Sequence, residues 1–368
     1  MADAGTAAGG VAAAPGASPS AAAGDWKAMD KAMAARDKSF PAATKGRGGQ
    51  LLAPKVLADG TKEFHLTAKI AKWEIEPGKI VDAWTYNGTV PGPTIHVNFG
   101  DKVRVVVTNE LPESTSVHWH GLHVPNGMDG VSDVTQDPIK PGGTFTYVFP
   151  ITQRVAVSWY HSHHDGTKQV SSGLWGAILV GEMPVPAGVK VNQNVNLQLQ
   201  DSGTIGLTIN GKSFPATEPV KARMGDWVEV NYFNAGTLAH PMHLHGVDQL
   251  VIAKDGFPLP APYLADTINV APAERYTVLV HADALGTWAW HCHIFPHAEG
   301  PQGMFGLVTT MVTSLGRSAS RAPLGVPHRR SMRGHHPQPH CFPPLTARPN
   351  SLFRAIHLER GLRPCKRI

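Results

Sequence analysis

The chain has 368 residues, of which 42% are hydrophobic and 17% charged, so it is long enough for two or more domains with packed cores. Its formal charge of +5 is unevenly distributed, because residues 315–368 carry a net charge of +10 and residues 1–314 a net charge of −5. The mildly acidic body argues against nucleic-acid binding. The absence of an apolar run of about 18 residues argues against a membrane-spanning helix.

Segment 1–50 is expected to be a low-complexity, flexible N-terminal region. Residues 1–24 are rich in Ala, Gly, Pro and Ser, and they lack the basic start and continuous apolar core of a secretory signal. Residues 25–38 allow a short amphipathic helix with Trp26, Met29 and Met33 on one side. We expect this helix to lie on the surface without a chemical role.

From about Leu51 onward the sequence is typical of short strands joined by turns. Seven segments look strand-like: 102–109, 144–149, 176–181, 194–200, 226–233, 275–282 and 304–313. Turn-forming Asn-Gly and Pro-Gly pairs occur at 87–88, 91–92, 141–142 and 210–211. This spacing predicts an all-β fold built from sandwiches.

The body consists of two similar halves. Residues 87–109 match residues 210–234 in order, and each match precedes a His-x-His-Gly and then a second His-x-His. Such self-similarity indicates an internal duplication. We therefore predict one domain over 51–183 and another over 193–314, joined by a linker at 184–192. Residues 315–368 are basic, show no periodicity and are expected to be a disordered tail.

Four His-x-His pairs suggest a metal centre. They are His118/His120, His161/His163, His243/His245 and His291/His293. Residues two apart on a strand point to the same face, so each pair can present two imidazoles together. One such pair could equally be structural, whereas four in one chain favour a metal cluster.

The segment HCHIFPH at 291–297 predicts a second kind of site. Cys292 is the only cysteine of the body, and on a strand it points away from His291 and His293. Together with His240 and His297 it gives the two-His, one-Cys set of blue copper sites, which a weak axial Met often completes. Zinc fits these ligands less specifically and cannot change its redox state.

The motifs HWHGL (118–122), WYHSH (159–163), HPMHLHG (240–246) and HCHIFPH (291–297) resemble the four copper motifs of the multicopper oxidases. The resemblance covers about residues 60–313, and the duplication is similar to that of the two-domain, laccase-like branch. It implies two cupredoxin-like Greek-key β-sandwiches that hold four coppers, one of type 1, one of type 2 and two of type 3.

The resemblance also assigns the ligands. It gives His240, Cys292 and His297 to the type 1 copper, His118 and His243 to type 2, and His120, His161, His163, His245, His291 and His293 to type 3. The usual axial position falls on Gln302, but the expected Gly-Met stands at 303–304, so we predict Met304 as axial neighbour with Gln302 as the alternative. Ser162 replaces the cysteine in the first half, which argues against the copper nitrite reductases.

Two acids are candidates for handling the protons that water formation consumes. Asp129 matches the acid that follows the first motif in the family, and Glu299 lies near the type 1 loop. Cys292 is expected to receive electrons and pass them to His291 and His293.

The predicted function is that of a laccase-like oxidase, which oxidises phenols, aromatic amines or metal ions and reduces dioxygen to water. A Cu(I) or other metal oxidase, a nitrite reductase and a non-catalytic copper or electron-transfer protein remain alternatives. Each domain carries only four of the eight cluster histidines, so we expect a homotrimer with clusters between subunits, as the resemblance implies. We expect the protein to be secreted or periplasmic, and neither nucleic acid nor membrane is an expected partner.

Overall fold

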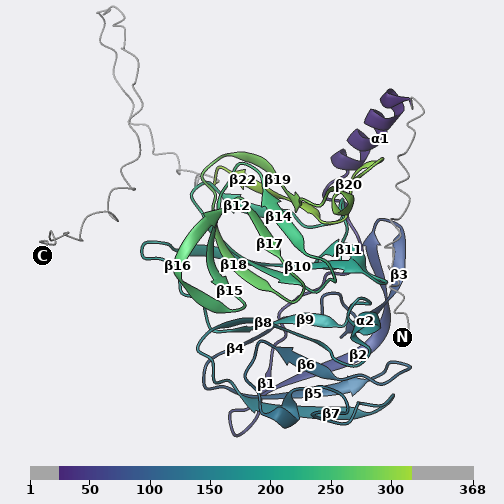
Figure 1. Ribbon diagram of the computed structural model, residues 1–368, viewed down its shortest axis with the longest axis vertical. Helices are drawn as coiled ribbons and strands as arrows, with labels where there is room; N and C mark the ends of the chain where they lie inside the picture. Colours follow the sequence, from purple (N-terminus) through teal and green to yellow (C-terminus); the bar gives the residue numbers. More distant parts are fainter. Residues whose placement is uncertain (1–24, 317–368) are drawn as a thin grey trace, which may run out of the picture. The chain divides into compact units, whose positions relative to one another are not determined.

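The computed structural model describes residues 25–316. The expectations for residues 1–24 and for the tail from residue 317 onward therefore lie outside the described residues. The predicted all-β architecture is confirmed, since most of the described chain forms strands of two β-sandwiches (Figure 1). In the described part, no helix is long and apolar enough to span a membrane.

Four sheets make up the two sandwiches. In the first sandwich, one sheet holds β1 (Lys55–Val56), β2 (Lys62–Glu76), β3 (Lys79–Tyr86), β5 (Lys102–Asn109) and β7 (Thr144–Pro150), and the other holds β4 (Ile95–Val97), β6 (Val117–His120), β8 (Ala156–Ser162) and β9 (Trp175–Val180). In the second, one sheet holds β10 (Val191–Ser202), β11 (Gly206–Ile209), β13 (Trp227–Asn234), β15 (Gln249–Lys254), β16 (Phe257–Ala265) and β18 (Arg275–His281). The other sheet of the second sandwich holds β12 (Val220–Arg223), β14 (His240–Leu244), β17 (Thr267–Val270), β19 (Gly286–Cys292) and β22 (Val308–Ser314).

The remaining elements are short, apart from one helix. They are α1 (Trp26–Lys38), the turn η1 (Asn126–Met128), α2 (Gly166–Gln169), the turn η2 (Phe295–His297), and the hairpin of β20 (Glu299–Gly300) and β21 (Gly303–Met304).

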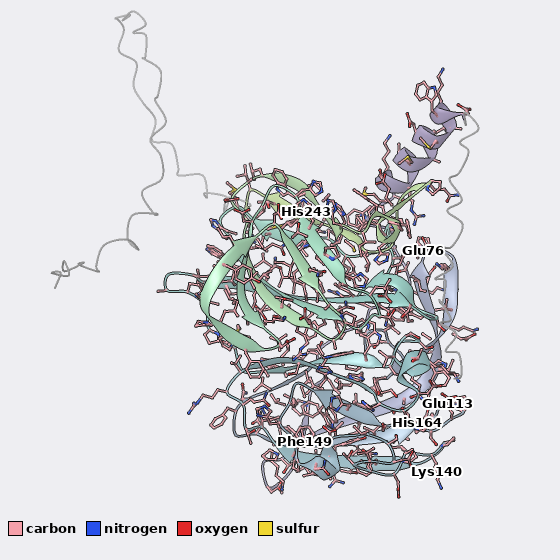
Figure 2. The ribbon with its side chains drawn as sticks, in the orientation of Figure 1. Glu76, Glu113, Lys140, Phe149, His164 and His243 are labelled. Atoms are coloured by element: carbon pink, nitrogen blue, oxygen red, sulfur yellow. The ribbon has the colours of Figure 1, made fainter. Side chains whose placement is uncertain are left out.

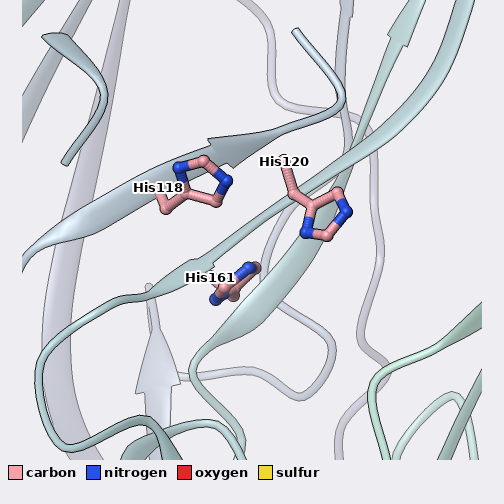
Figure 3. A group of neighbouring side chains, drawn as sticks. All are labelled: His118, His120 and His161. Carbon is pink, nitrogen blue, oxygen red and sulfur yellow. The ribbon is translucent and has the colours of Figure 1, made fainter. Parts of the chain in front are cut away.

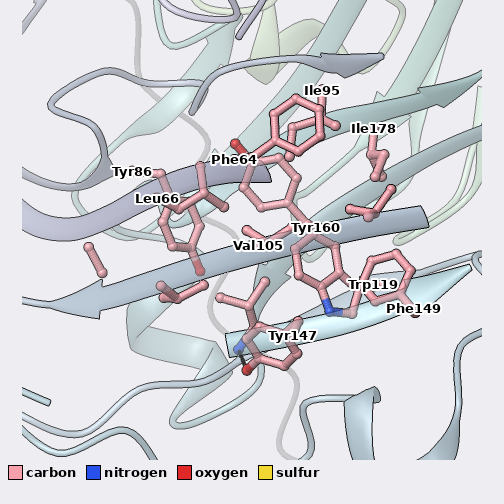
Figure 4. Packing of buried hydrophobic residues seen from close by; sticks show 14 of the residues in the cluster. Phe64, Leu66, Tyr86, Ile95, Val105, Trp119, Tyr147, Phe149, Tyr160 and Ile178 are labelled. Carbon is pink, nitrogen blue, oxygen red and sulfur yellow. Dashed lines mark hydrogen bonds between the residues drawn. The ribbon is translucent and has the colours of Figure 1, made fainter. Parts of the chain in front are cut away.

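Each sandwich encloses its own apolar core, because alternate residues of every strand point inward. The first core contains Phe64, Trp119, Tyr147 and Tyr160, all fully buried and packed between the two sheets (Figure 4). The second core contains Tyr232, Trp290 and Cys292. Cys292 is therefore part of the packed interior of the second sandwich.

A third apolar cluster joins the two sandwiches. Trp159 and Trp175 of β8 and β9 pack with Phe233 of β13, Ile252 of β15 and Leu279 of β18. A cation spans the same boundary, because Lys212 Nζ donates to the carbonyls of Lys45 (2.8 Å) and Glu74 (2.7 Å). The sandwiches therefore meet over a packed, water-excluding boundary.

The internal duplication is visible in local geometry. Asn87 and Asn210 both adopt left-handed backbone conformations, at φ 57° and 52°. Asn87 Oδ1 accepts from Thr67 N and its Nδ2 donates to His65 O, while Asn210 Oδ1 accepts from Gln198 N and its Nδ2 donates to Asn196 O. The same side chain thus closes the same turn against an equivalent strand in each half.

Helix α1 matches the predicted amphipathic segment. Asp25 caps it by accepting from the backbone N–H groups of Lys27 and Ala28. None of its residues is buried, but Arg36 anchors it by donating to Met304 O at 2.6 Å and Phe214 O at 2.7 Å. The helix is therefore attached next to the hairpin that follows His297.

The strand predicted over 304–313 is wrong at its start. β22 begins at Val308, because Gly303 and Gly306 take positive φ values (96° and 62°) and turn the chain. The turn lets Leu307 N donate to His297 O at 2.9 Å, so this loop closes around His297.

We predict that Phe233→Ala lowers the free energy of unfolding by about 3–5 kcal/mol, because it opens a cavity at the boundary between the sandwiches. Phe257→Ala is the matched control, since Phe257 is 59% exposed on the edge strand β16 and should change stability by less than about 0.5 kcal/mol. Urea unfolding followed by circular dichroism measures both variants. If both variants lost the same free energy of unfolding, packing at the boundary would contribute no more to stability than an exposed side chain does.

Candidate metal centre

Three buried donor atoms converge in the second sandwich. Cys292 Sγ lies 3.8 Å from His240 Nδ1 and 3.7 Å from His297 Nδ1, and the two nitrogens are 3.3 Å apart. His240 and Cys292 are fully buried, and His297 is 9% exposed. We call these residues the trio. Two imidazole nitrogens and one thiol sulfur form a donor set that suits copper.

Strand pairing builds the trio. β14 begins at His240, β19 ends at Cys292, and the two strands pair antiparallel with Met242 opposite Cys292. His297 comes from the turn η2, just after β19. Burial raises the pKa of the Cys292 thiol to about 11. Metal binding must therefore displace a proton from this sulfur.

Asp201, which no sequence motif indicated, contacts the trio through His240. Its Oδ2 lies 3.1 Å from His240 Nε2, and both side chains are inaccessible to solvent. Thr237 N, Thr237 Oγ1 and Leu238 N donate to the same carboxylate. Burial by itself would raise the pKa of Asp201, but the contacts with His240, Thr237 and Leu238 lower it below its ordinary value.

The Asp201 carboxylate also fixes the orientation of the His240 ring. Because the negatively charged carboxylate lies next to Nε2, the ring presents Nδ1 to the other two members of the trio. An outer carboxylate commonly orients a metal-binding histidine in this way. Asp201 lies on β10, far from His240 in the sequence. A single acid within a strand does not indicate a contact with a metal ligand.

The first sandwich gathers His118 and His120 of β6 with His161 of β8 and His163 just after it (Figure 3 shows the first three). Ring centroids lie 5.3 Å apart for His118 and His161, and 5.5 Å for His118 and His163. Ligand atoms of His118, His120 and His161 lie within 4.8 Å of one another. We call these four residues the first half-site.

The second sandwich presents an equivalent group, the second half-site. His243 and His291 face each other on β14 and β19, and His245 and His293 lie beside them. His245 Nε2 and His291 Nε2 are 3.0 Å apart. Cys292 lies in the core while its two neighbours lie outside it, so β19 contributes to the trio with one face and to this half-site with the other.

Backbone carbonyls orient matching histidines in the two half-sites. His118 Nδ1 lies 2.8 Å from Asp129 O, and His243 Nδ1 lies 3.0 Å from Asp266 O. His161 Nδ1 and His291 Nδ1 each contact the carbonyl of the next residue, at 2.8 Å and 2.9 Å. In each case the contact assigns the proton to Nδ1 and leaves Nε2 free to bind a metal.

Burial favours the neutral form of four half-site imidazoles. It lowers the pKa of His161 to about 3 and, together with the positive charge of Arg275, lowers the pKa of His120 to about 4. Burial also lowers the pKa of His291 and His245. A neutral imidazole is the form that binds a metal, so His120 and His161 stay able to bind one at mildly acidic pH.

The two half-sites are separate within the chain. Among the described residues, every close ring pair of the eight half-site histidines joins members of one half-site. β6 and β8 belong to the first sandwich and β14 and β19 to the second (Figure 1). His243 accordingly lies in the second sandwich (Figure 2). Each half-site holds only half of the ligands expected for a cluster.

The other predicted site residues lie near these groups. Asp129 Oδ1 is 3.4 Å from His118 Nδ1. Glu299 is exposed on the hairpin after His297 and pairs with Met304, whose side chain packs against Phe214. Gln302 is exposed at the tip of this hairpin.

The first sandwich has no counterpart of the trio among its described residues. Ser162 occupies the cysteine position, is 1% exposed and donates to Gln169 Oε1. Thr115 Oγ1 donates to the same amide oxygen at 2.8 Å. A hydrogen-bonded polar network therefore fills this position.

Comparison with known proteins identifies the family. Two multicopper oxidase domain models match residues 67–184 and 185–314. The chain belongs to the multicopper oxidase family. This membership implies copper as the metal of the trio and half-sites.

The relatives differ in length and in name. A blue copper oxidase from Nitrosomonas europaea is 34% identical, with a TM-score of 0.64 over 68% of this chain and 85% of that one. Laccase-2 of Botryotinia fuckeliana is 30% identical over 66% of this chain and 48% of the relative. A probable nitrite reductase–hydroxylamine oxidoreductase fusion protein of Kuenenia stuttgartiensis is 32% identical over 68% of this chain and 31% of the relative. The chain thus spans less than half the length of these two curated relatives.

We predict that Asp201→Asn raises the reduction potential of copper bound at the trio. Removing the negative charge beside His240 destabilises the more highly charged Cu(II) form, and a tenfold effect on the one-electron equilibrium corresponds to about 59 mV. Redox titration of the copper-loaded protein, followed by its blue absorption, measures the change.

Asn234→Ala is the control for this prediction. Asn234 Nδ2 donates to Leu238 O and its Oδ1 accepts from Gly236 N, so it stabilises the same loop without contacting His240. Equal potentials in the Asp201→Asn variant and the wild type would contradict a role for the charge.

Proposed function

We propose that the protein is a laccase-like multicopper oxidase that oxidises phenolic or aromatic substrates one electron at a time and reduces dioxygen to water. The observation that carries the proposal is the end of β19, where Cys292 joins the trio while His291, and His293 just after the strand, join a cluster half-site. An electron arriving at the trio is then one peptide unit from the cluster ligands. Family membership and laccase relatives support the same activity.

The proposed ligand assignment follows the two kinds of site. The type 1 copper would be held by His240, Cys292 and His297, with Met304 as the proposed further neighbour. The type 2 copper would be held by His118 and His243, and the type 3 pair by His120, His161, His163, His245, His291 and His293. Bound copper supplies the one-electron redox chemistry that none of these side chains offers by itself. The exposed position of Gln302 favours Met304 as the axial residue.

Proton handling is assigned to carboxylates. Asp129 lies beside His118, is one-third exposed and can exchange protons with solvent while it contacts the half-site. Glu299 lies on the hairpin that follows His297 of the trio. A role of Glu299 in proton transfer would therefore concern the trio and not the half-sites. Asp129 is thus the carboxylate better placed for water formation.

We further propose that the active form is a homotrimer. The two half-sites of one chain lie on different sandwiches, so a complete eight-histidine cluster needs a first sandwich and the second sandwich of a neighbour. Such a head-to-tail contact can close into a ring. The protein is also proposed to act outside the cytoplasm, as a secreted or periplasmic enzyme.

The alternatives differ in substrate or acceptor. A metal oxidase would use the same trio with Cu(I) or another metal ion as donor. The Kuenenia relative carries nitrite reductase in its name, but the polar network around Ser162 leaves the first sandwich without a blue-copper site of the nitrite reductase kind. A non-catalytic copper protein would have no use for two half-sites of four histidines each.

The test of the proposed activity is dioxygen uptake by the purified, copper-loaded protein. With a phenol or aromatic diamine as donor, we expect one dioxygen consumed per four electrons donated, and Cys292→Ser should lose both this uptake and the blue absorption while keeping other copper. Cu(I) as sole effective donor would favour the metal oxidase, and anaerobic nitrite turnover would favour a reductase. A blue protein without uptake for any donor would overturn the proposal.

Subunit mixing tests the shared cluster. His118→Ala/His120→Ala and His291→Ala/His293→Ala variants should each be inactive, and denaturing and refolding them together with copper should restore part of the activity. Restoration is expected because some interfaces of a mixed ring receive all eight wild-type ligands. A fully active, copper-loaded monomer by light scattering would contradict the trimer.

A further inference from the structure

Arg275 starts a strand of the second sandwich, but its guanidinium reaches into the first. Its Nε donates to Val157 O of β8 at 3.1 Å. The side chain is 4% exposed. Nη1 and Nη2 donate to Ala273 O at 2.9 Å and Asp255 O at 3.0 Å. Arg275 is therefore held rigidly in its own sandwich while it contacts a strand that carries cluster ligands of the other.

The same guanidinium packs on the residue that follows His120. A Cβ added to Gly121, which has φ +86°, would lie 2.6 Å from Arg275 Nη2 and 2.9 Å from Ser158 Oγ. The glycine of HWHG is thus required both by its backbone conformation and by the arginine above it. Arg275 therefore contacts the end of β6, which carries His118 and His120, as well as β8, which carries His161.

The corresponding glycine of the second half has a different neighbour. A Cβ on Gly246 would lie 2.5 Å from the ring of Trp288, which belongs to the same sandwich. The second half-site is therefore supported from within its own sandwich. The first half-site is supported across the boundary, by a charged group from the sandwich that holds the trio.

The charge on Arg275 is only partly offset. Asp255 Oδ1 lies 3.4 Å from Nη1, and this carboxylate is 36% exposed. The remaining contacts of the guanidinium are to neutral carbonyl oxygens. The planar guanidinium donates to three carbonyls in different directions, and the ammonium group of a lysine cannot reproduce this geometry.

We propose that Arg275 is a positioning residue for the first half-site, which clamps β6 and β8 at the spacing that binds cluster copper and ties this half-site to the sandwich carrying the trio. The proposal rests on the proposed function, because it assumes that the histidines of the first half-site hold copper. Arg275 itself contacts none of the reacting groups. Its effect passes through Gly121 and Val157 to the strands that present His120 and His161.

Copper content and absorption, rather than activity, test the clamp. We expect Arg275→Met to keep one blue copper per chain, because the trio lies in the second sandwich, and to lose cluster copper to a chelator at roughly 10–100-fold lower chelator concentration than the wild type. Arg275→Lys should resemble Arg275→Met. Gly121→Ala should show the same selective loss, since its methyl group displaces the guanidinium while Arg275 is still present.

Lys212→Met is the matched control. Lys212 also carries a cation across the boundary, where it donates to two carbonyls and lies 3.9 Å from the centroid of the Trp73 ring, but it contacts neither β6 nor β8. We expect it to lower stability and to leave cluster copper unchanged. If Lys212→Met loses cluster copper as Arg275→Met does, the effect is general loosening of the boundary and the clamp is refuted.

The remaining outcomes are also decisive. Wild-type protein that binds only blue copper would overturn the proposed function itself. Wild-type protein with a full cluster, and variants that keep it with equal affinity, would overturn the role of Arg275 alone. Should Arg275→Met fail to fold by circular dichroism, Arg275→Lys and Gly121→Ala give the same comparison.

Discussion

The alternation of side chains along β19 is the constraint on which the candidate sites depend. His291 and Cys292 are the last two residues of the strand and His293 follows at once, so the thiol points to one face and the imidazole of His291 to the other. The structure places the thiol in the core of the second sandwich and both histidines outside it. The trio and the second half-site therefore meet at the end of one strand and in the residue that follows it.

The boundary between the sandwiches is the second requirement. Trp159 lies in the apolar cluster of this boundary, and its ring is 4.2 Å from that of His161. Histidines of the first half-site thus rest on side chains that also contact the second sandwich. Arg275 of the second sandwich also contacts this strand, through Val157 O. The geometry of the first half-site is for this reason a property of both sandwiches, although all four of its histidines come from one.

Backbone carbonyls orient four of the half-site histidines through their Nδ1 atoms. The contacts of His118 and His243, and those of His161 and His291, repeat the same arrangement in both halves. A carbonyl acceptor at Nδ1 makes the opposite nitrogen available without adding charge. His240 is different, because it receives the charge of Asp201 at Nε2 and offers Nδ1. His240 and these four half-site histidines thus offer opposite ring nitrogens and have different kinds of partner.

The all-β fold, the duplication and the candidate ligands could be predicted from the amino-acid sequence, because each leaves a local pattern of strands, turns or motifs. Strand residues two apart share a face, turn pairs such as Asn87-Gly88 punctuate the strands, and the His-x-His motifs carry their geometry with them. The prediction of a strand over 304–313 was wrong at its start. Gly303 and Gly306 turn the chain there, and Leu307 N donates to the His297 carbonyl instead of continuing a strand. The roles of Asp201 and Arg275 could be found only from the folded structure. Each acts on residues far away in the chain, across a sheet or across the boundary between sandwiches, and no local pattern encodes a contact that exists only after the two sandwiches have packed.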